Sequence, residues 1–286
     1  MSRDSLAWQS KLILLLVLPV VGCGLVLETH DWISSAPPVA YWSLGLSAGL
    51  GIITLALRAA TPFAAVTGAA ITAQLMYATA AIPFHAWRTY IVPVLAVSLL
   101  AFAATRMGRS KKERLGTAEA RRGRTAAQVA ANLGAAALIS TSLFESWAVN
   151  SRWMPHSATA LLAASLAAMA EAAADTVSSE TGQVFGGRPR MITTLRSVDP
   201  GTDGGITVAG TIAGIAAGAI VAVLGSFAVH GDLRFFLIAT AGAIFGLFFD
   251  SLLGATLERK GWLNNDAVNF LSTISAAAFT LFAIAI

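Results

Sequence analysis

Long apolar stretches recur along the whole chain and are separated by short polar segments. Apolar stretches of about 18 or more residues are typical of helices that cross a bilayer. The stretches are rich in Ala and Leu and do not alternate with polar residues, so they indicate helices rather than barrel strands. We predict an all-α, polytopic transmembrane bundle of about nine spans, with seven to nine as the range. The predicted spans cover residues 11–27, 40–57, 62–82, 89–105, 125–147, 157–177, 205–229, 233–254 and 267–286.

The composition agrees with this pattern. Hydrophobic residues make up 56% of the 286 positions and charged residues only 12%. Soluble domains carry about 25% charged residues. A soluble protein of this length would need more polar surface, which excludes that class.

The charge of the connecting segments alternates along the chain. Residues 106–124, between the fourth and fifth predicted spans, hold eight basic and two acidic residues. Under the positive-inside rule this side is cytoplasmic. We therefore predict a multi-pass protein of the inner (plasma) membrane with its N-terminus in the cytoplasm and its C-terminus outside. Segment 106–124 has no interleaved aromatic residues, so we expect no nucleic-acid partner.

The first predicted span stands apart from the rest in our division of the chain. We expect residues 1–38 to form a membrane anchor and residues 39–286 a transmembrane catalytic domain. Cys23, the only cysteine, is interpreted as a small apolar side chain in the first span, with a lipoprotein cleavage site as the alternative. The oligomeric state stays open, a homo-oligomer included.

Ionisable residues lie inside the sixth predicted span. Glu171 and Asp175 are four residues apart, so they share a helix face; Ser179 continues this face and Glu180 follows it. A charged group within the bilayer is costly unless it is paired or hydrated, which makes it a candidate for function. Two adjacent carboxylates also require a proton or a cation between them. A pair at a solvated helix end is the alternative.

Three other spans carry polar residues at the same predicted depth. Gln128 and Asn132 lie near the start of the fifth span, four residues apart, with Arg124 before them. Asp250 lies near the end of the eighth span on a face of small residues, and Asn269 lies near the start of the ninth. The predicted topology brings these residues to the cytoplasmic side with Asp175. We therefore expect one shared site there.

The segment between the sixth and seventh spans suits an anion. It contains three arginines, several threonines and the glycines of the sequence GTDGG at 201–205. Glycines let backbone amides approach an anion closely, and the following helix N-terminus also favours one. The segment is not a Walker A motif, and a simple turn is an equally good interpretation of the glycines alone.

Carboxylates alone would suggest cation transport or a proton relay. Together with arginines, threonines and a glycine loop, they suggest phosphate held with Mg²⁺, which is commonly bound by one or two carboxylates and substrate phosphates. The sequence offers neither the histidine pair or cysteine cluster of a zinc site nor a Ser-His-Asp set.

Four motifs resemble a family of integral membrane proteins first described as a domain of unknown function, which includes the plant chloroplast phytyl-phosphate kinase. They are GRTAAQVAANLG at 123–134, AEAAADTVSSETG at 170–182, ITTLRSVDPGTDGGITVAGT at 192–211 and DSLLGATLE at 250–258. The resemblance covers roughly residues 40–286. It implies phosphoryl transfer from a nucleoside triphosphate, CTP being the expected donor, to an isoprenyl monophosphate such as phytyl or geranylgeranyl phosphate. Related CTP-dependent polyprenol kinases phosphorylate the free alcohol instead, and that alternative stays open.

We expect three groups of site residues on these grounds. The candidate catalytic carboxylates are Glu171, Asp175, Glu180 and Asp250, of which Asp175, Glu180 and Asp250 are the candidate Mg²⁺ ligands. The candidate substrate and nucleotide residues are Arg124, Gln128, Asn132, Thr176, Ser179, Arg188, Arg190, Thr194, Arg196, Gly201, Thr202, Gly204, Gly205, Ser251 and Asn269. A cation-coupled transporter or channel that uses the same carboxylates is the alternative, and a structural membrane subunit is a third.

Overall fold

A computed structural model describes residues 6–117, 123–151 and 157–285 of the protein. Each of the nine predicted apolar segments contains a helix. These helices are α1 (Ala7–Ser35), α2 (Pro37–Ala56), α3 (Pro62–Ala78), α4 (Ile91–Arg106), α6 (Ala126–Ile139), α8 (Ala158–Phe185), α9 (Val208–Ala228), α10 (Leu233–Leu253) and α11 (Asn265–Ala285).

Shorter elements join the long helices. They are α5 (Arg109–Leu115), α7 (Ser142–Asn150), the 3₁₀ turn Ala86–Arg88, the π-helical turn Gly254–Glu258 at the end of α10, and the strands β1 (Arg190–Met191) and β2 (Gly205–Ile206). The two strands pair antiparallel and close a loop between α8 and α9.

The described helices include six that are long and apolar enough to cross a membrane, or eight if two bent pairs each form one span. The bent pairs are α4 with α5, at 63°, and α6 with α7, at 52°. The count of eight falls within the predicted range. Helix α3 has 17 residues and is about 26 Å long, which is less than the roughly 30 Å of a hydrocarbon core.

The fifth predicted span, 125–147, is not one helix. Helix α6 ends at Ile139, and Thr141 starts α7 by accepting a hydrogen bond from the backbone N–H of Phe144. A side chain that caps a new helix inside an apolar run favours a break there. Hydropathy alone does not reveal such a break.

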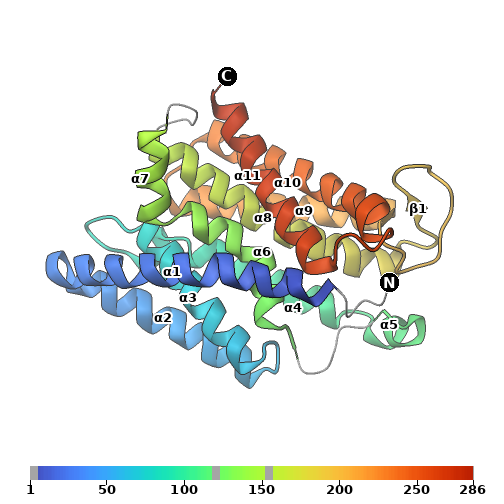
Figure 1. The fold of residues 1–286 in the computed structure, drawn as a ribbon, viewed down its shortest axis with the longest axis horizontal. Coiled ribbons are helices and arrows are strands. Elements are labelled where there is room, and N and C mark those ends of the chain that lie inside the picture. The colour runs from blue at the N-terminus through green and yellow to red at the C-terminus, as the bar shows by residue number, and fades with distance from the viewer. Residues whose placement is uncertain (1–5, 118–122, 152–156, 286) are drawn as a thin grey trace.

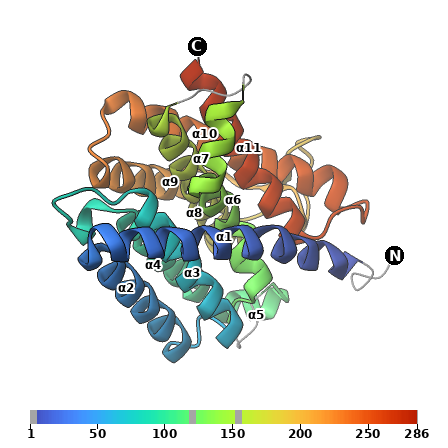
Figure 2. The same cartoon turned by 60° about the vertical axis from the view of Figure 1, so that its left-hand side comes forward.

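Helix α8 forms the centre of the bundle. It packs against α4, α6, α9, α10 and α11, and most of its residues from Ala160 to Ala174 are buried. Alanines let these neighbours approach its backbone closely. Figure 2 shows α8 and α6 in the interior, behind α1.

The N-terminal part of the chain belongs to the same bundle. Helix α1 packs on α2, α3 and α6, and α2 and α3 form a tight hairpin. Hydrogen bonds also join the start of α1 to the turn before α11 and to its first turn: Gln9 Nε2 donates to Trp262 O at 2.8 Å, and Ser10 Oγ donates to Asp266 Oδ2 at 2.6 Å. The start of α1, α5 and the β1 loop gather at one end of the helices, while the end of α11 and α7 lie toward the other (Figure 1).

Candidate functional site

A cavity of about 790 Å³ opens at the end of the bundle where the β1 loop lies. Gln128 of α6, Asp175 of α8, Asp250 of α10 and Asn269 of α11 all line it. These are the four helices that the sequence predicts to converge. We call this space the acidic cavity, because its lining carries Asp175, Asp203, Asp250, Glu258 and Asp266 and, within the described residues, no Lys or Arg.

Two carboxyl groups meet inside the acidic cavity. The side chains of Asp175 and Asp250 lie within hydrogen-bonding reach of each other, and Asp250 Oδ2 is buried without a partner. A hydrogen bond between two carboxyl groups requires a proton on one of them, because an ionised carboxylate only accepts. A divalent cation between the two groups would satisfy both without that proton. Within the described residues, no group of three His, Cys, Asp or Glu side chains is arranged to hold a metal ion.

Glu171 lies behind this carboxyl pair. It is 1% exposed, it does not line the cavity, and the hydroxyl of Ser272 lies within hydrogen-bonding reach of both Glu171 and Asp250. The absence of a side chain at Gly246 makes room for it, since a Cβ there would lie 2.5 Å from Glu171 Cγ. The predicted small-residue face of α10 thus packs inside the protein, and Glu171 supports the pair from the interior.

Three helices begin at the wall of the acidic cavity. Thr207 caps α9, Asn264 precedes α11 and caps its first turn through Ala267 N, and Gln128 forms a capping box with Thr125 at the start of α6. Thr207, Asn264 and Gln128 line the cavity. The N-terminal end of a helix carries partial positive charge and unpaired N–H groups, so it attracts anions. The backbone therefore supplies the positive potential that the lining side chains lack.

The predicted glycine loop borders the same space. Gly201, Thr202, Gly204 and Gly205 line the cavity, and the backbone N–H of Gly205 donates to Thr202 O at 2.9 Å. Gly204 has φ = 76°, and a Cβ there would lie 2.4 Å from the backbone N of Ala255. No other residue fits this close approach without displacing the loop. Ser179 and Ser251 complete the predicted residues in the lining.

Glu180 lies in a different place from the other predicted metal ligands. Its Oε2 atom accepts from Lys112 Nζ at 2.5 Å, and Lys112 is only 1% exposed. Lys112 Nζ also donates to the carbonyl oxygens of Ala104 and Thr105. Glu180 does not line the cavity; it pairs with a buried lysine instead, so we assign it a structural role.

The other predicted residues fall outside the acidic cavity. Arg188, Arg190, Thr194 and Arg196 are exposed and absent from the lining. Arg190 donates to Leu195 O at 3.1 Å, a contact within the β1 loop itself. Thr176 is buried, and its hydroxyl accepts from Arg124 Nη2 at 3.4 Å.

Gln128 and Asn132 share a helix face, as predicted, but they line different cavities. Gln128 Oε1 folds back to accept from Thr125 N at 2.7 Å, which turns its side chain toward the helix start. Asn132 Nδ2 donates to Gln128 O at 2.7 Å. Arg124 and Asn132 line a second cavity of about 750 Å³ instead.

The sequence interpretation missed several residues of the acidic cavity. Asp203 stands inside the glycine loop, and Glu258 follows Asp250 by eight residues, a spacing that returns to the same helix face. That spacing was the available signal for Glu258. Other polar lining residues without a predicted role include Ser178, Asn264, Asn265 and Asp266.

Comparison with known proteins places the chain. The family described as "Integral membrane protein DUF92" matches residues 48–277. The chain belongs to this family. It is therefore an integral, multi-pass membrane protein, in agreement with its candidate spans. No solved structure matches it.

Similar proteins come from an archaeon, a cyanobacterium and a plant. The uncharacterized membrane protein MJ0933 of Methanocaldococcus jannaschii is 45% identical over 38% of this chain and 45% of its own length. The uncharacterized membrane protein sll0875 of Synechocystis is 34% identical over 68% of this chain and 73% of its own length. Protein VTE6, chloroplastic, of Arabidopsis thaliana is 28% identical over 87% of this chain and 73% of its own length.

Proposed function

We propose that this protein is an integral-membrane kinase that transfers a phosphoryl group from a nucleoside triphosphate to an isoprenyl monophosphate. CTP is the expected donor, and phytyl or geranylgeranyl phosphate is the expected acceptor. The observation that carries the proposal is the carboxyl pair of Asp175 and Asp250 in a cavity bordered by three helix N-termini. The similarity to VTE6 over 87% of the chain and the resemblance to the phytyl-phosphate kinase family support it.

The acidic cavity receives the triphosphate in this proposal. A nucleotide brings further negative charge to a lining of five carboxylates, so it binds there only with cations. Asp175 and Asp250 would hold Mg²⁺, and the unpartnered Oδ2 of Asp250 fits that role. Mg²⁺ supplies charge neutralisation between the carboxylates and the phosphates. The glycine loop and the helix N-termini orient the phosphates through backbone N–H groups.

The transfer itself needs little from the side chains. An oxygen of the acceptor monophosphate attacks the γ-phosphorus, and the bond from that phosphorus to the β–γ bridging oxygen breaks. The nucleoside diphosphate leaves, and the prenyl diphosphate forms. The acceptor is already an anion near neutral pH, so no strong general base is required, and positioning and charge neutralisation supply the catalysis.

We place the acidic cavity at the cytoplasmic face of the plasma membrane, since the basic segment 106–124 lies on the same side by the positive-inside rule. A soluble nucleotide reaches the cavity from the cytoplasm there, while the prenyl chain stays among the helices.

The test uses purified protein with Mg²⁺, CTP and phytyl or geranylgeranyl monophosphate, and it measures the diphosphate product. Asp175→Asn should abolish product formation, whereas Asp199→Asn, at an exposed position of the loop between α8 and α9, should not. Absence of product with every nucleotide and every prenyl chain tested would refute the proposal.

A cation transporter or channel is the second candidate, because the described lining of the acidic cavity has five carboxylates and no basic side chain. Such a lining also suits a cation alone. Cation flux into proteoliposomes that Asp175→Asn removes, without any phosphoryl transfer, would favour this function over the kinase.

A further inference from the structure

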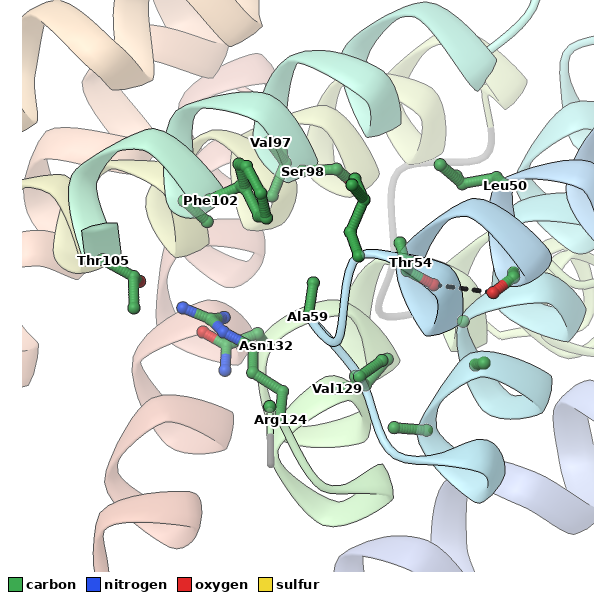
Figure 3. Close-up of a pocket in the computed structure, with 18 of the residues that line it drawn as sticks. Leu50, Thr54, Ala59, Val97, Ser98, Phe102, Thr105, Arg124, Val129 and Asn132 are labelled. Atoms are coloured by element: carbon green, nitrogen blue, oxygen red, sulfur yellow. Dashed lines mark hydrogen bonds between the residues drawn. The ribbon is translucent and has the colours of Figure 1, made fainter. Parts of the chain in front are cut away.

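The charged side chains that line the second cavity are of the opposite sign to those that line the acidic cavity. Four arginines line it (Arg58, Arg106, Arg109 and Arg124), and its described lining contains no Asp or Glu. Its remaining walls are mostly small or apolar residues of α2, α3, α4 and α6. We call it the arginine cavity. Figure 3 shows Arg124, Asn132 and Thr105 toward one end of it and Leu50 and Thr54 toward the other.

Backbone contacts bring the arginines together. Arg124 N donates to Ala59 O at 2.9 Å, and Thr61 N donates to Arg124 O at 3.0 Å, so the strand before α6 is joined to the α2–α3 turn that carries Arg58. A Cβ at Gly123 would lie 2.5 Å from the carbonyl carbon of Ala59. Only glycine permits this approach.

Arg106 reaches the same turn from α4. Its Nη2 atom donates to Leu57 O at 2.9 Å, and its guanidinium lies over the ring of Phe102 at 4.1 Å. Arg109 follows the bend at Gly108 and pairs with Glu113 at 3.1 Å. Three elements separated in sequence thus carry positive charge to one end of the cavity.

The apolar part of the cavity follows the helices away from the arginines. Its lining on α4 extends from Arg106 back to Val94, twelve residues, which corresponds to about 18 Å along a helix. Helix α4 packs mainly on α8 and α9 and only slightly on α3. The volume of the arginine cavity, about 750 Å³, is within the range of roughly 300–1,000 Å³ that is typical of small-molecule sites.

Arg124 connects this cavity to the acidic one. It lines the arginine cavity, donates to Thr176 on α8, and interacts electrostatically with Asp175 in the acidic cavity. A phosphate held by Arg124 would therefore lie beside the carboxyl pair. Arginine suits this task because its planar guanidinium binds phosphate through two hydrogen bonds.

We infer that the arginine cavity is the binding site of the acceptor lipid, with the monophosphate at the arginines and the prenyl chain between α4 and the α2–α3 hairpin. This inference rests on the proposed function, since it assigns a place to the acceptor of that reaction. Charge and shape select the occupant: an anionic head group on one long apolar chain.

The first test narrows the cavity. Gly68 lines it on α3, and a Cβ there has only Val129 Cγ1 within 4 Å, at 3.9 Å. Gly68→Phe should raise the KM for phytyl phosphate about tenfold or more and leave the KM for CTP and for a five-carbon prenyl phosphate unchanged. Gly45→Phe is the matched control, because Gly45 of α2 is exposed, has nothing within 4 Å and lies outside the lining.

The second test removes charge. Arg58→Gln should raise the KM for the acceptor about tenfold, as expected for a lost hydrogen bond to a charged group. Arg58→Lys should recover part of the loss. Arg234→Gln, an exposed arginine at the start of α10, should change nothing.

A binding measurement separates this inference from the proposed function. A diazirine-bearing prenyl monophosphate should label α2, α3 or α4 residues of the arginine cavity, with and without nucleotide, and phytyl phosphate should compete. Labelling there without diphosphate formation would support the lipid site and refute the kinase. Three results would refute the lipid site while diphosphate formation still supports the kinase. They are labelling outside the arginine cavity, unchanged kinetics of Gly68→Phe, and competition by phosphatidylglycerol equal to that by phytyl phosphate.

Discussion

The acidic cavity and the arginine cavity are nearly equal in volume, at about 790 and 750 Å³, and opposite in charge. The first has five carboxylates and no described basic lining residue; the second has four arginines and no described acidic one. Helices α6 and α8 contribute residues to both. In the proposed reaction, this separation would keep the anionic lipid away from uncompensated carboxylates, while Arg124, which lines one cavity, interacts with Asp175 in the other. One reaction can thereby use two anionic substrates with different requirements.

The buried ion pair of Lys112 and Glu180 offers the largest expected effect. Lys112→Met leaves Glu180 without its buried partner, which should destabilise the fold by about 3–5 kcal/mol. Thermal unfolding in detergent measures the loss, and Lys111→Met, at the exposed neighbouring lysine, is the control.

The double variant Lys112→Met with Glu180→Gln should recover much of that stability, because it removes both charges. If Glu180→Gln alone abolished Mg²⁺-dependent activity without changing stability, Glu180 would be a metal ligand after all and its structural assignment would be wrong.

Within the acidic cavity, Asp250→Asn removes one member of the carboxyl pair. It should lower kcat about 10²–10³-fold, in the range found for lost transition-state stabilisation, while photolabelling by the prenyl phosphate stays unchanged. Steady-state kinetics and labelling together check this. Asp232→Asn is the control at the other end of α10, since Asn also caps a helix well.

A substitution in the glycine loop should have a smaller effect, limited to the KM for the nucleotide. Gly204→Ala places a Cβ against the backbone of Ala255 and should raise the KM for CTP about tenfold through a displaced loop, given overpacking costs of about 1–3 kcal/mol. Gly187→Ala also has a positive φ, 68°, but nothing within 4 Å, so it separates backbone strain from the collision. Equal effects of the two variants on the KM for CTP would mean that backbone strain, and not the contact with Ala255, causes the change.

The smallest expected effects come from two residues of α6. Gln128→Ala should raise the KM for CTP, and Asn132→Ala should raise the KM for the acceptor, each about threefold to tenfold for one lost hydrogen bond. The KM for CTP and the KM for the acceptor are measured for both variants. A rise of the same KM in both variants would contradict the assignment of Gln128 and Asn132 to different substrates.

The helical class and the convergence of α6, α8, α10 and α11 could be predicted because hydropathy, spacing and charge asymmetry are local properties of the sequence. The ion pair of Glu180 with Lys112 could not be predicted, because Lys112 lies in the short helix α5, 68 residues away in the sequence. Gln128 and Asn132 line different cavities because the capping box turns the Gln128 side chain toward the start of α6. The arginine cavity could not be predicted from the sequence, because the convergence of Arg58, Arg106 and Arg124 depends on backbone contacts between distant turns.

The hydrogen bonds from Gln9 and Ser10 to the turn before α11 have a consequence for shortened forms of the protein. Asn264 and Asp266, which line the acidic cavity, receive their positioning from a helix more than 250 residues earlier. Removal of the first 22 residues, as in lipoprotein processing at Cys23, would remove these hydrogen bonds. We therefore expect the proposed kinase activity to require an intact α1, which positions residues of the proposed nucleotide site.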